Sequence, residues 1–301
     1  MLRWRLILGT VFVLVLGALV YLDYKSGKPG LYLLPVALLF ALLAAGEMVR
    51  LGTRSDRQPP RWSIGLGTLL VVASNFIPHL MPNYPTNCPI GQLGWPLLTL
   101  AGVILLVALV QLVRFESAEM ACANLAYSIF AITYVGLLLS FVVQLRYLGD
   151  RGWGILALAS LLIVVKMSDI GAYFVGRALG RHKLAPKVSP GKTIEGFAGG
   201  LLFAVIGAWL SFEVLAPRAF HIEVAYRWWS LILYGVLLAT AGVVGDLSES
   251  VLKRAAGQKD SSAWMPGFGG ILDMLDSVLT AAPVAFLLLV AKWIAAADAG
   301  P

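Results

Sequence analysis

Two pairs of carboxylates enter apolar sequence near the C-terminal end of the chain, and both pairs have the same spacing. They are Asp246-x-x-Glu249-Ser250 and Asp273-x-x-Asp276-Ser277. Side chains three or four residues apart share one face of a helix, so two such faces brought together would offer up to four carboxylates. Hard oxygen ligands of this kind suit Mg²⁺, which takes its remaining ligands from water and substrate phosphates. The metal-ligand candidates are therefore Asp246, Glu249, Asp273 and Asp276.

Cations and glycines separate the two carboxylate pairs. The cations are Lys253, Arg254 and Lys259, and the glycines are Gly267, Gly269 and Gly270. The cations can neutralise a polyphosphate, and glycines let the backbone approach a ligand closely. A purely structural explanation, in which a basic loop joins two helices, accounts for the cations. It does not explain why Asp273 and Asp276 enter an apolar helix.

A second candidate segment runs from residue 180 to residue 196, where cations, hydroxyls and Gly/Pro turns alternate. Thr193 can cap a helix that begins near Glu195. A helix N-terminus beside Lys187, Ser189 and Lys192 would bind phosphate well. The Gly-x4-Gly-Lys frame of a P-loop is absent. A basic loop that only touches lipid headgroups is an equally open alternative.

A third candidate lies within a predicted helix, where Lys166 and Asp169 are three residues apart and share a face. An ion pair that only holds helices together would explain them. Ionised side chains inside a membrane are costly, however, and usually mark a functional site. We therefore take Asp169 as a candidate substrate-binding residue.

The composition shows which elements must position these residues. Hydrophobic residues make up 59% of the 301 residues and charged residues 13%, about half the charge of a soluble domain. Apolar runs near the length needed to span a bilayer recur along the chain, at about 4–22, 31–49, 63–80, 94–113, 121–144, 153–176, 196–215, 228–248 and 271–294. Backbone groups in lipid must be satisfied internally, so these runs should be helices. The sequence predicts an all-α polytopic integral membrane protein with about nine transmembrane helices.

The basic residues predict the orientation of this helical protein. With the N-terminus inside, fifteen of the 23 Lys and Arg residues fall in inner segments and seven in outer ones. This bias predicts that the N-terminus is inside, the C-terminus is outside, and both motif loops face the cytoplasm. The net charge of +7 suits anionic lipid and phosphate. No nucleic-acid partner is expected, because nothing resembles a soluble basic domain.

The chemistry is concentrated in the second half of what we expect to be a single membrane domain over residues 1–301. Residues 1–150 are predicted to be scaffold helices, and residues 151–301 catalytic helices and cytoplasmic loops. Within the first half, Glu47 and Arg50 stand at the end of a predicted helix. We expect them to extend to the membrane interface.

Three segments, in order, resemble the motifs of phosphatidate cytidylyltransferases, also called CDP-diacylglycerol synthases. The resemblance covers about residues 160–290. The segments are Ser168-Asp169-x-Gly171-Ala172-Tyr173, then Lys187-x-Ser189-Pro190-Gly191-Lys192-Thr193-x-Glu195-Gly196, then Ser250-x-x-Lys253-Arg254-x4-Lys259-Asp260 with Pro266-Gly267-x-Gly269-Gly270-x-x-Asp273-x-x-Asp276.

This resemblance implies an enzyme of the inner membrane with its active site at the cytoplasmic face. CTP and phosphatidate from the inner leaflet would give CDP-diacylglycerol and pyrophosphate. Mg²⁺ would be required, and the resemblance also suggests K⁺ beside the same carboxylates. The catalytic candidates are Asp246, Asp273, Lys253 and Lys259. The substrate-binding candidates are Asp169, Lys187, Ser189, Lys192, Thr193, Arg254, Gly269 and Gly270.

The chain departs from the family pattern at Phe268, where His is usual, and at Met274, where Arg is usual. The reaction class should survive, because the phosphate monoester is already largely ionised and transfer depends on positioning and charge neutralisation. The departures bear on the rate and on the acceptor lipid. A CTP-dependent transferase acting on another membrane lipid therefore stays open. A secondary transporter and a silent lipid-binding paralogue are weaker alternatives, and a homodimer is compatible with any of them.

Overall fold

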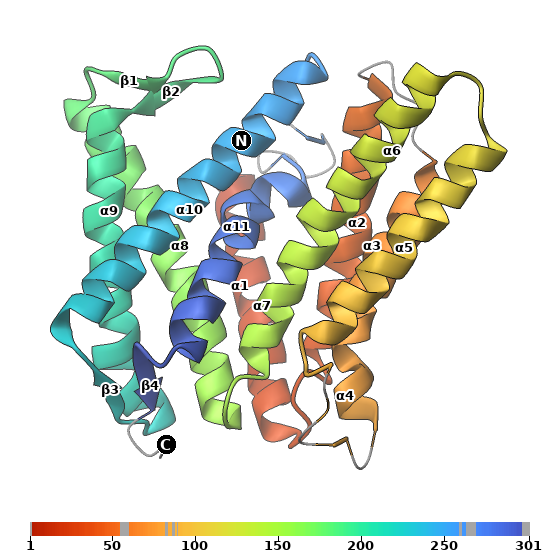
Figure 1. Cartoon of the computed structure of the whole chain (residues 1–301). Coiled ribbons are helices and arrows are strands. Elements are labelled where there is room, and N and C mark those ends of the chain that lie inside the picture. Colours follow the sequence, from red (N-terminus) through yellow and green to blue (C-terminus); the bar gives the residue numbers. More distant parts are fainter. Residues whose placement is uncertain are drawn as a thin grey trace. The chain divides into compact units, whose positions relative to one another are not determined.

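The helices expected from the sequence are present in the computed structural model, which describes residues 2–54, 60–81, 84–85, 88, 90–258, 261–262 and 269–296. Within this part of the chain, eight helices are long and apolar enough to cross a membrane, and each coincides with one of the predicted runs. A further helix, α1 (Leu2–Lys25), covers the run predicted at 4–22. The prediction of an all-α polytopic membrane protein is thus confirmed (Figure 1).

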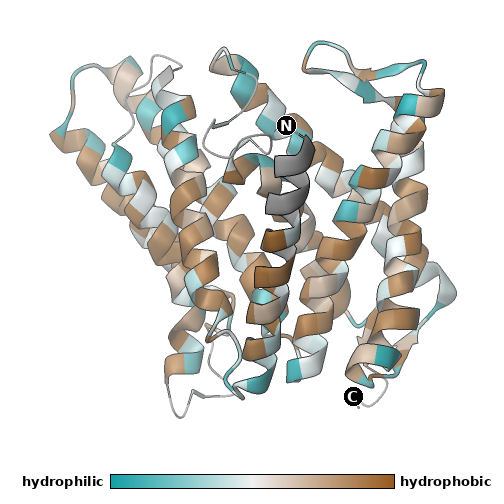
Figure 2. Cartoon of the chain, turned by 180° about the vertical axis from the view of Figure 1, so that it is seen from behind, coloured by the Kyte–Doolittle hydropathy of each residue, from teal (hydrophilic) through white to brown (hydrophobic). Residues whose placement is uncertain are grey.

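Hydrophobic residues cover most of the length of the helices, and hydrophilic residues gather toward helix ends and connections (Figure 2). This distribution is expected of helices surrounded by lipid, whose ends meet water and headgroups. The orientation with the N-terminus inside stays a prediction from the positions of Lys and Arg.

The chain forms two compact units, which are described separately. The first comprises Met1–Gln144 with Leu252–Met274, and the second Leu145–Val251 with Leu275–Pro301. Two helices contribute to both units, namely α10 (Trp228–Ala255) and α11 (Ile271–Val290). The last turn of α10 and the first residues of α11 therefore belong with the N-terminal helices.

In the first unit, α3 (Arg61–Ala73) is the central helix. It packs against α2 (Leu33–Arg54), α5 (Gly94–Val113) and α6 (Ala118–Ile132), and its residues Ile64 and Val71 are fully buried. The remaining elements of this unit are the 3₁₀ turn η1 (Ser74–Phe76), α4 (Ile77–Leu80), the π-helical segment η2 (Thr133–Leu137) and most of α7 (Leu138–Arg146).

In the second unit, α8 (Arg151–Leu179) packs along α9 (Ile194–Trp209). Gly171 and Gly199 lie where these helices meet, and a Cβ at Gly171 would stand only 2.7 Å from the carbonyl oxygen of Gly199. Such glycines allow two helix backbones to approach closely. The π-helical segment η3 (Leu210–Phe220) extends α9 beyond the predicted end at residue 215.

Two short antiparallel sheets complete the second unit. The hairpin of β1 (Lys183–Ala185) and β2 (Ser189–Thr193) pairs Lys183 with Thr193, whereas the sequence predicted only a loop here. The strands β3 (Val224–Tyr226) and β4 (Ile294–Ala296) pair near the other ends of the helices.

The middle of α10 also packs against α11 within the second unit. Thr280 Oγ1 donates to the carbonyl oxygen of Ala241 at 2.8 Å. Gly245 faces the carbonyl oxygen of Asp276 and the hydroxyl of Thr280 so closely that a Cβ would collide with both. This approach brings the helix faces that carry Asp246 and Asp276 together.

The packing of α9 against α10 gives a stability prediction. A Cβ at Gly235 would stand 2.7 Å from the backbone nitrogen of Val205. Gly235→Ala should therefore lower the stability by about 1–3 kcal/mol, as overpacking typically does. The measurement is thermal unfolding of the purified protein in detergent.

The matched control is Gly102→Ala in α5, where an added Cβ meets nothing within 4 Å. Alanine should be neutral or slightly stabilising there, because glycine is the poorer helix former. Equal melting temperatures for the two variants would contradict the close approach of α9 and α10.

Candidate functional site

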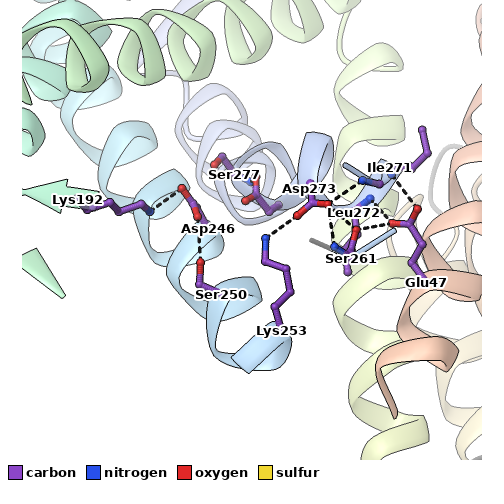
Figure 3. A network of polar contacts seen from close by, with 12 residues as sticks. Glu47, Lys192, Asp246, Ser250, Lys253, Ser261, Ile271, Leu272, Asp273 and Ser277 are labelled. Carbon is purple, nitrogen blue, oxygen red and sulfur yellow. Dashed lines mark hydrogen bonds and ion pairs between the residues drawn. The ribbon is translucent and has the colours of Figure 1, made fainter. Parts of the chain in front are cut away.

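In the second unit, a lysine of the hairpin meets the first predicted metal ligand. Lys192 Nζ lies 2.6 Å from Asp246 Oδ2, and Ser250 Oγ donates to Asp246 Oδ1 at 3.4 Å (Figure 3). Ser250 follows Asp246 by one helical turn on α10, as the spacing predicted. The second motif is thus joined by an ion pair to the carboxylate pair of α10.

Two further carboxylates stand beside Asp246 in this unit. Asp276 is buried, interacts electrostatically with Asp246, and lies within hydrogen-bonding reach of Glu249. Glu249 is fully buried on α10. The backbone N–H of Ser277 donates to Asp276 Oδ1 at 2.5 Å. Like charges this close require compensation by cations or protons, so the cluster suits a ligand of positive charge.

The motif on α8 faces the same cluster. Lys166 Nζ lies 3.2 Å from Asp169 Oδ2, and both side chains are about half exposed, at 53% and 50%. The pair lies within one helix, so it does not tie two helices together. Asp169 also interacts electrostatically with Asp246 and Lys192. The charges of the first two motifs and of Asp246 therefore act on one another within the second unit.

The hairpin carries the cations of the second motif and leads directly into α9. Lys187 lies exposed between the strands, and Ser189 begins β2. Thr193 is the N-cap of α9, because its Oγ1 accepts from the N–H of Gly196 at 3.1 Å. The predicted cap is confirmed, with the helix starting at Ile194. Thr193 thus fixes the N-terminus of α9.

In the first unit, Asp273 is held on several sides. Its Oδ1 lies 2.5 Å from Lys253 Nζ, and both side chains are only 12% exposed. Its Oδ2 accepts from the N–H of Gly270 at 2.7 Å, and from the hydroxyl and N–H of Ser261 at 2.7 and 3.1 Å (Figure 3). Gly269 has φ +80°, and a Cβ there would collide with the Asp273 carboxylate. Glycine is therefore required at this turn.

Glu47 on α2 also belongs to this network, although the sequence predicted a position at the membrane interface. It is 5% exposed, its oxygens accept from the N–H groups of Ile271 and Leu272, and Ser261 Oγ lies 2.9 Å from its Oε2. The expectation that it extends to the membrane interface is wrong, because the first turn of α11 covers it. The signal was present in the sequence: an acidic residue inside an apolar run, as at Asp169.

The remaining candidates are less constrained. Arg254 is exposed in the last turn of α10. Met274 is partly buried on α11, directly after Asp273. Lys259, Gly267 and Phe268 lie outside the residues that the structure describes.

The carboxylates of the second unit are oxygen donors of the kind that Mg²⁺ prefers. Among the described residues, no group of three or more His, Cys, Asp and Glu side chains is arranged to bind a metal ion. Mg²⁺ in phosphate sites is commonly held by one or two carboxylates together with water and phosphate oxygens. Asp246 and Asp276 provide such carboxylates, with Glu249 adjacent and Lys192 paired with Asp246. These residues fit Mg²⁺ that arrives with a phosphorylated substrate.

Comparisons with known proteins extend beyond the motifs. The sequence model of the cytidylyltransferase family matches residues 3–291. A phosphatidate cytidylyltransferase of Bacillus subtilis (strain 168) is 39% identical over 159 residues, which are 53% of this chain and 56% of the relative. The phosphatidate cytidylyltransferase of Staphylococcus haemolyticus is 30% identical over 261 residues, which are 87% of this chain and 91% of the relative. That of Staphylococcus saprophyticus is 29% identical over 263 residues, which are 87% of this chain and 92% of the relative. The similarity thus includes the N-terminal helices, where the motifs gave no information.

The cap at Thr193 gives a prediction. Thr193→Ala should lower stability by about 1 kcal/mol, because the N–H of Gly196 loses its acceptor, and Thr193→Ser should retain the cap. Thermal unfolding in detergent measures both. Thr240→Ala is the control, because the Thr240 hydroxyl is exposed and donates to the carbonyl oxygen of Val236 in the preceding turn of its own helix. Equal losses at Thr193 and Thr240 would contradict the capping role.

Proposed function

The chain belongs to the cytidylyltransferase family, and we propose that it transfers CMP from CTP to phosphatidate, which yields CDP-diacylglycerol and pyrophosphate. The observation that gives this proposal most support is the ion pair between Lys192 and Asp246, which joins the second motif to a cluster of carboxylates. We place the reaction at the cytoplasmic face of the inner membrane, where the positive residues of the motif loops are expected.

The nucleophile in this reaction is the phosphate of phosphatidate. A phosphate monoester has a second pKa near 6, so it is largely dianionic at neutral pH and needs little help from a general base. One of its oxygens forms a bond to the α-phosphorus of CTP. The bond from that phosphorus to the oxygen bridging to the β-phosphate breaks, and pyrophosphate leaves with the bonding electrons. No proton has to move in this step.

The protein's task is to hold two strongly anionic reactants together. Lys192 and Lys253 are each paired with a carboxylate, and their ammonium groups can turn to phosphate oxygens when substrate binds. Lys187 and Ser189 stand on the hairpin that leads into the N-terminus of α9. We assign these groups, with Arg254 and Lys259, to the triphosphate and the lipid phosphate.

Mg²⁺ would be held in the second unit by Asp246 with Asp276 and Glu249, and Asp273 is the metal ligand proposed for the first unit. When bound, the ion would neutralise phosphate charge and orient the leaving group. K⁺ beside the same carboxylates is part of the proposal. Phosphatidate would enter laterally from the inner leaflet while its acyl chains remain in lipid.

The proposed function is tested by pyrophosphate release from purified protein with CTP, Mg²⁺ and phosphatidate in mixed micelles. Asp246→Asn and Asp273→Asn should each lower the rate by more than about 100-fold, since losing even an outer partner of a metal site costs 10–100-fold. Glu213→Gln, at an exposed position of η3, is the control and should retain full activity. Full turnover in both Asn variants would overturn the metal assignment.

The acceptor lipid is tested by replacing phosphatidate with a polyprenyl phosphate in the same assay. We expect release with phosphatidate only. Pyrophosphate release with the polyprenyl phosphate alone would overturn phosphatidate as the acceptor while leaving the reaction class in place. It would also implicate Phe268 and Met274 in the choice of acceptor lipid.

A further inference from the structure

Glu47 lies on α2, more than 200 residues before the last motif in sequence, yet it contacts the residues that hold Asp273. Glu47 Oε1 accepts from the N–H of Ile271 at 3.0 Å, and Oε2 accepts from the N–H of Leu272 at 2.9 Å (Figure 3). The first N–H groups of a helix have no intrahelical acceptor. A carboxylate there also interacts favourably with the helix dipole. Glu47 therefore fixes the first turn of α11, in which Asp273 is the third residue.

Ser261 provides a second and more direct connection. Its hydroxyl lies 2.9 Å from Glu47 Oε2 and 2.7 Å from Asp273 Oδ2, so one side chain links the two carboxylates. Its backbone N–H donates to the same oxygen of Asp273. A change in the position of Glu47 would thus reach Asp273 both through the helix backbone and through Ser261.

The glycine before α11 shows how tightly this arrangement is built. A Cβ on Gly270 would collide with both carboxylate oxygens of Glu47 and with the hydroxyl of Ser261. Gly270 also donates its N–H to Asp273. Part of the requirement for glycine at this position comes from Glu47, independently of any substrate.

We propose that Glu47 is a positioning residue for the transferase reaction, which orients the Asp273 carboxylate through Ser261 and the first turn of α11. The proposal rests on the proposed function, because it takes Asp273 as a ligand of Mg²⁺. Neighbours that orient metal-binding groups typically contribute 10–100-fold to metal affinity or activity. Glu47 itself touches neither substrate nor metal in this scheme.

The experiment compares Glu47→Gln and Ser261→Ala with the unsubstituted full-length protein. Two quantities are measured: the Mg²⁺ concentration for half-maximal pyrophosphate release, and the rise in melting temperature with added Mg²⁺ in the absence of substrates. Both variants should need roughly tenfold more Mg²⁺ in each measurement. At saturating Mg²⁺ the KM for CTP should stay close to that of the unsubstituted protein.

The matched controls are Ser262→Ala and Glu119→Gln. Ser262 is the buried neighbour of Ser261, and its hydroxyl accepts from Arg50, whereas Glu119 is exposed in the first turn of α6. Neither substitution should change the Mg²⁺ dependence. A general loss of stability would lower melting temperatures without shifting the Mg²⁺ concentration required.

Ser261→Ala keeps Glu47 and its bonds to α11, so it remains decisive where Glu47→Gln lowers the yield of folded protein. Unchanged Mg²⁺ requirements in folded Ser261→Ala protein would overturn the proposal. Failure of the proposed function would look different, because the unsubstituted protein would then release no pyrophosphate. In that case the rise in melting temperature with added Mg²⁺ would still show whether the variants need more Mg²⁺ than the unsubstituted protein.

Discussion

A carboxylate removed from water needs a partner, and this requirement governs how the motif segments fold. Burial of an ionised group is unfavourable unless hydrogen bonds or opposite charge compensate it. Asp246 has Lys192, Asp273 has Lys253, and Glu47 has the N–H groups that begin α11. Each partner comes from another part of the sequence. The hairpin before α9 and the turn before α11 must therefore fold back onto helices, although both are connections.

Glycine makes these contacts possible in both units. Backbone N–H groups can reach a carboxylate only where no side chain intervenes, and Gly270 meets this condition beside Glu47 and Asp273. Gly245 has a different task in the second unit, where it lets α10 approach α11 beside Asp276. The motif glycines are thus explained in part by contacts inside the protein, before any nucleotide is considered.

The sequence predicted those features that depend on local pattern. Length and hydropathy indicated each membrane helix among the described residues, because such a helix needs only a continuous apolar run. The position of Thr193 indicated the start of α9, because a cap acts within one helical turn. The partners of Glu47 could not be predicted in this way. Ile271 lies 224 residues away in the sequence, and only tertiary packing brings it to Glu47. The same holds for Lys192, whose spacing suggested phosphate but not Asp246. The hairpin was missed because both strands are short, and because β2 contains Pro190 and Gly191, residue types that are unusual in strands.

The pairing of lysines with aspartates also explains how several carboxylates can stand near one another. Three carboxylates near one another would repel. Removing one partner of a buried ion pair usually lowers the stability more than replacing both partners by apolar residues does. Lys192 reduces that repulsion through its ion pair with Asp246, and in the proposed reaction it exchanges Asp246 for a phosphate. The carboxylates then lose a cation at the moment when Mg²⁺ and its phosphates arrive. Under this scheme neither the lysine nor the aspartate is left without an opposite charge, so the site can admit a highly charged substrate without a large electrostatic cost at either stage.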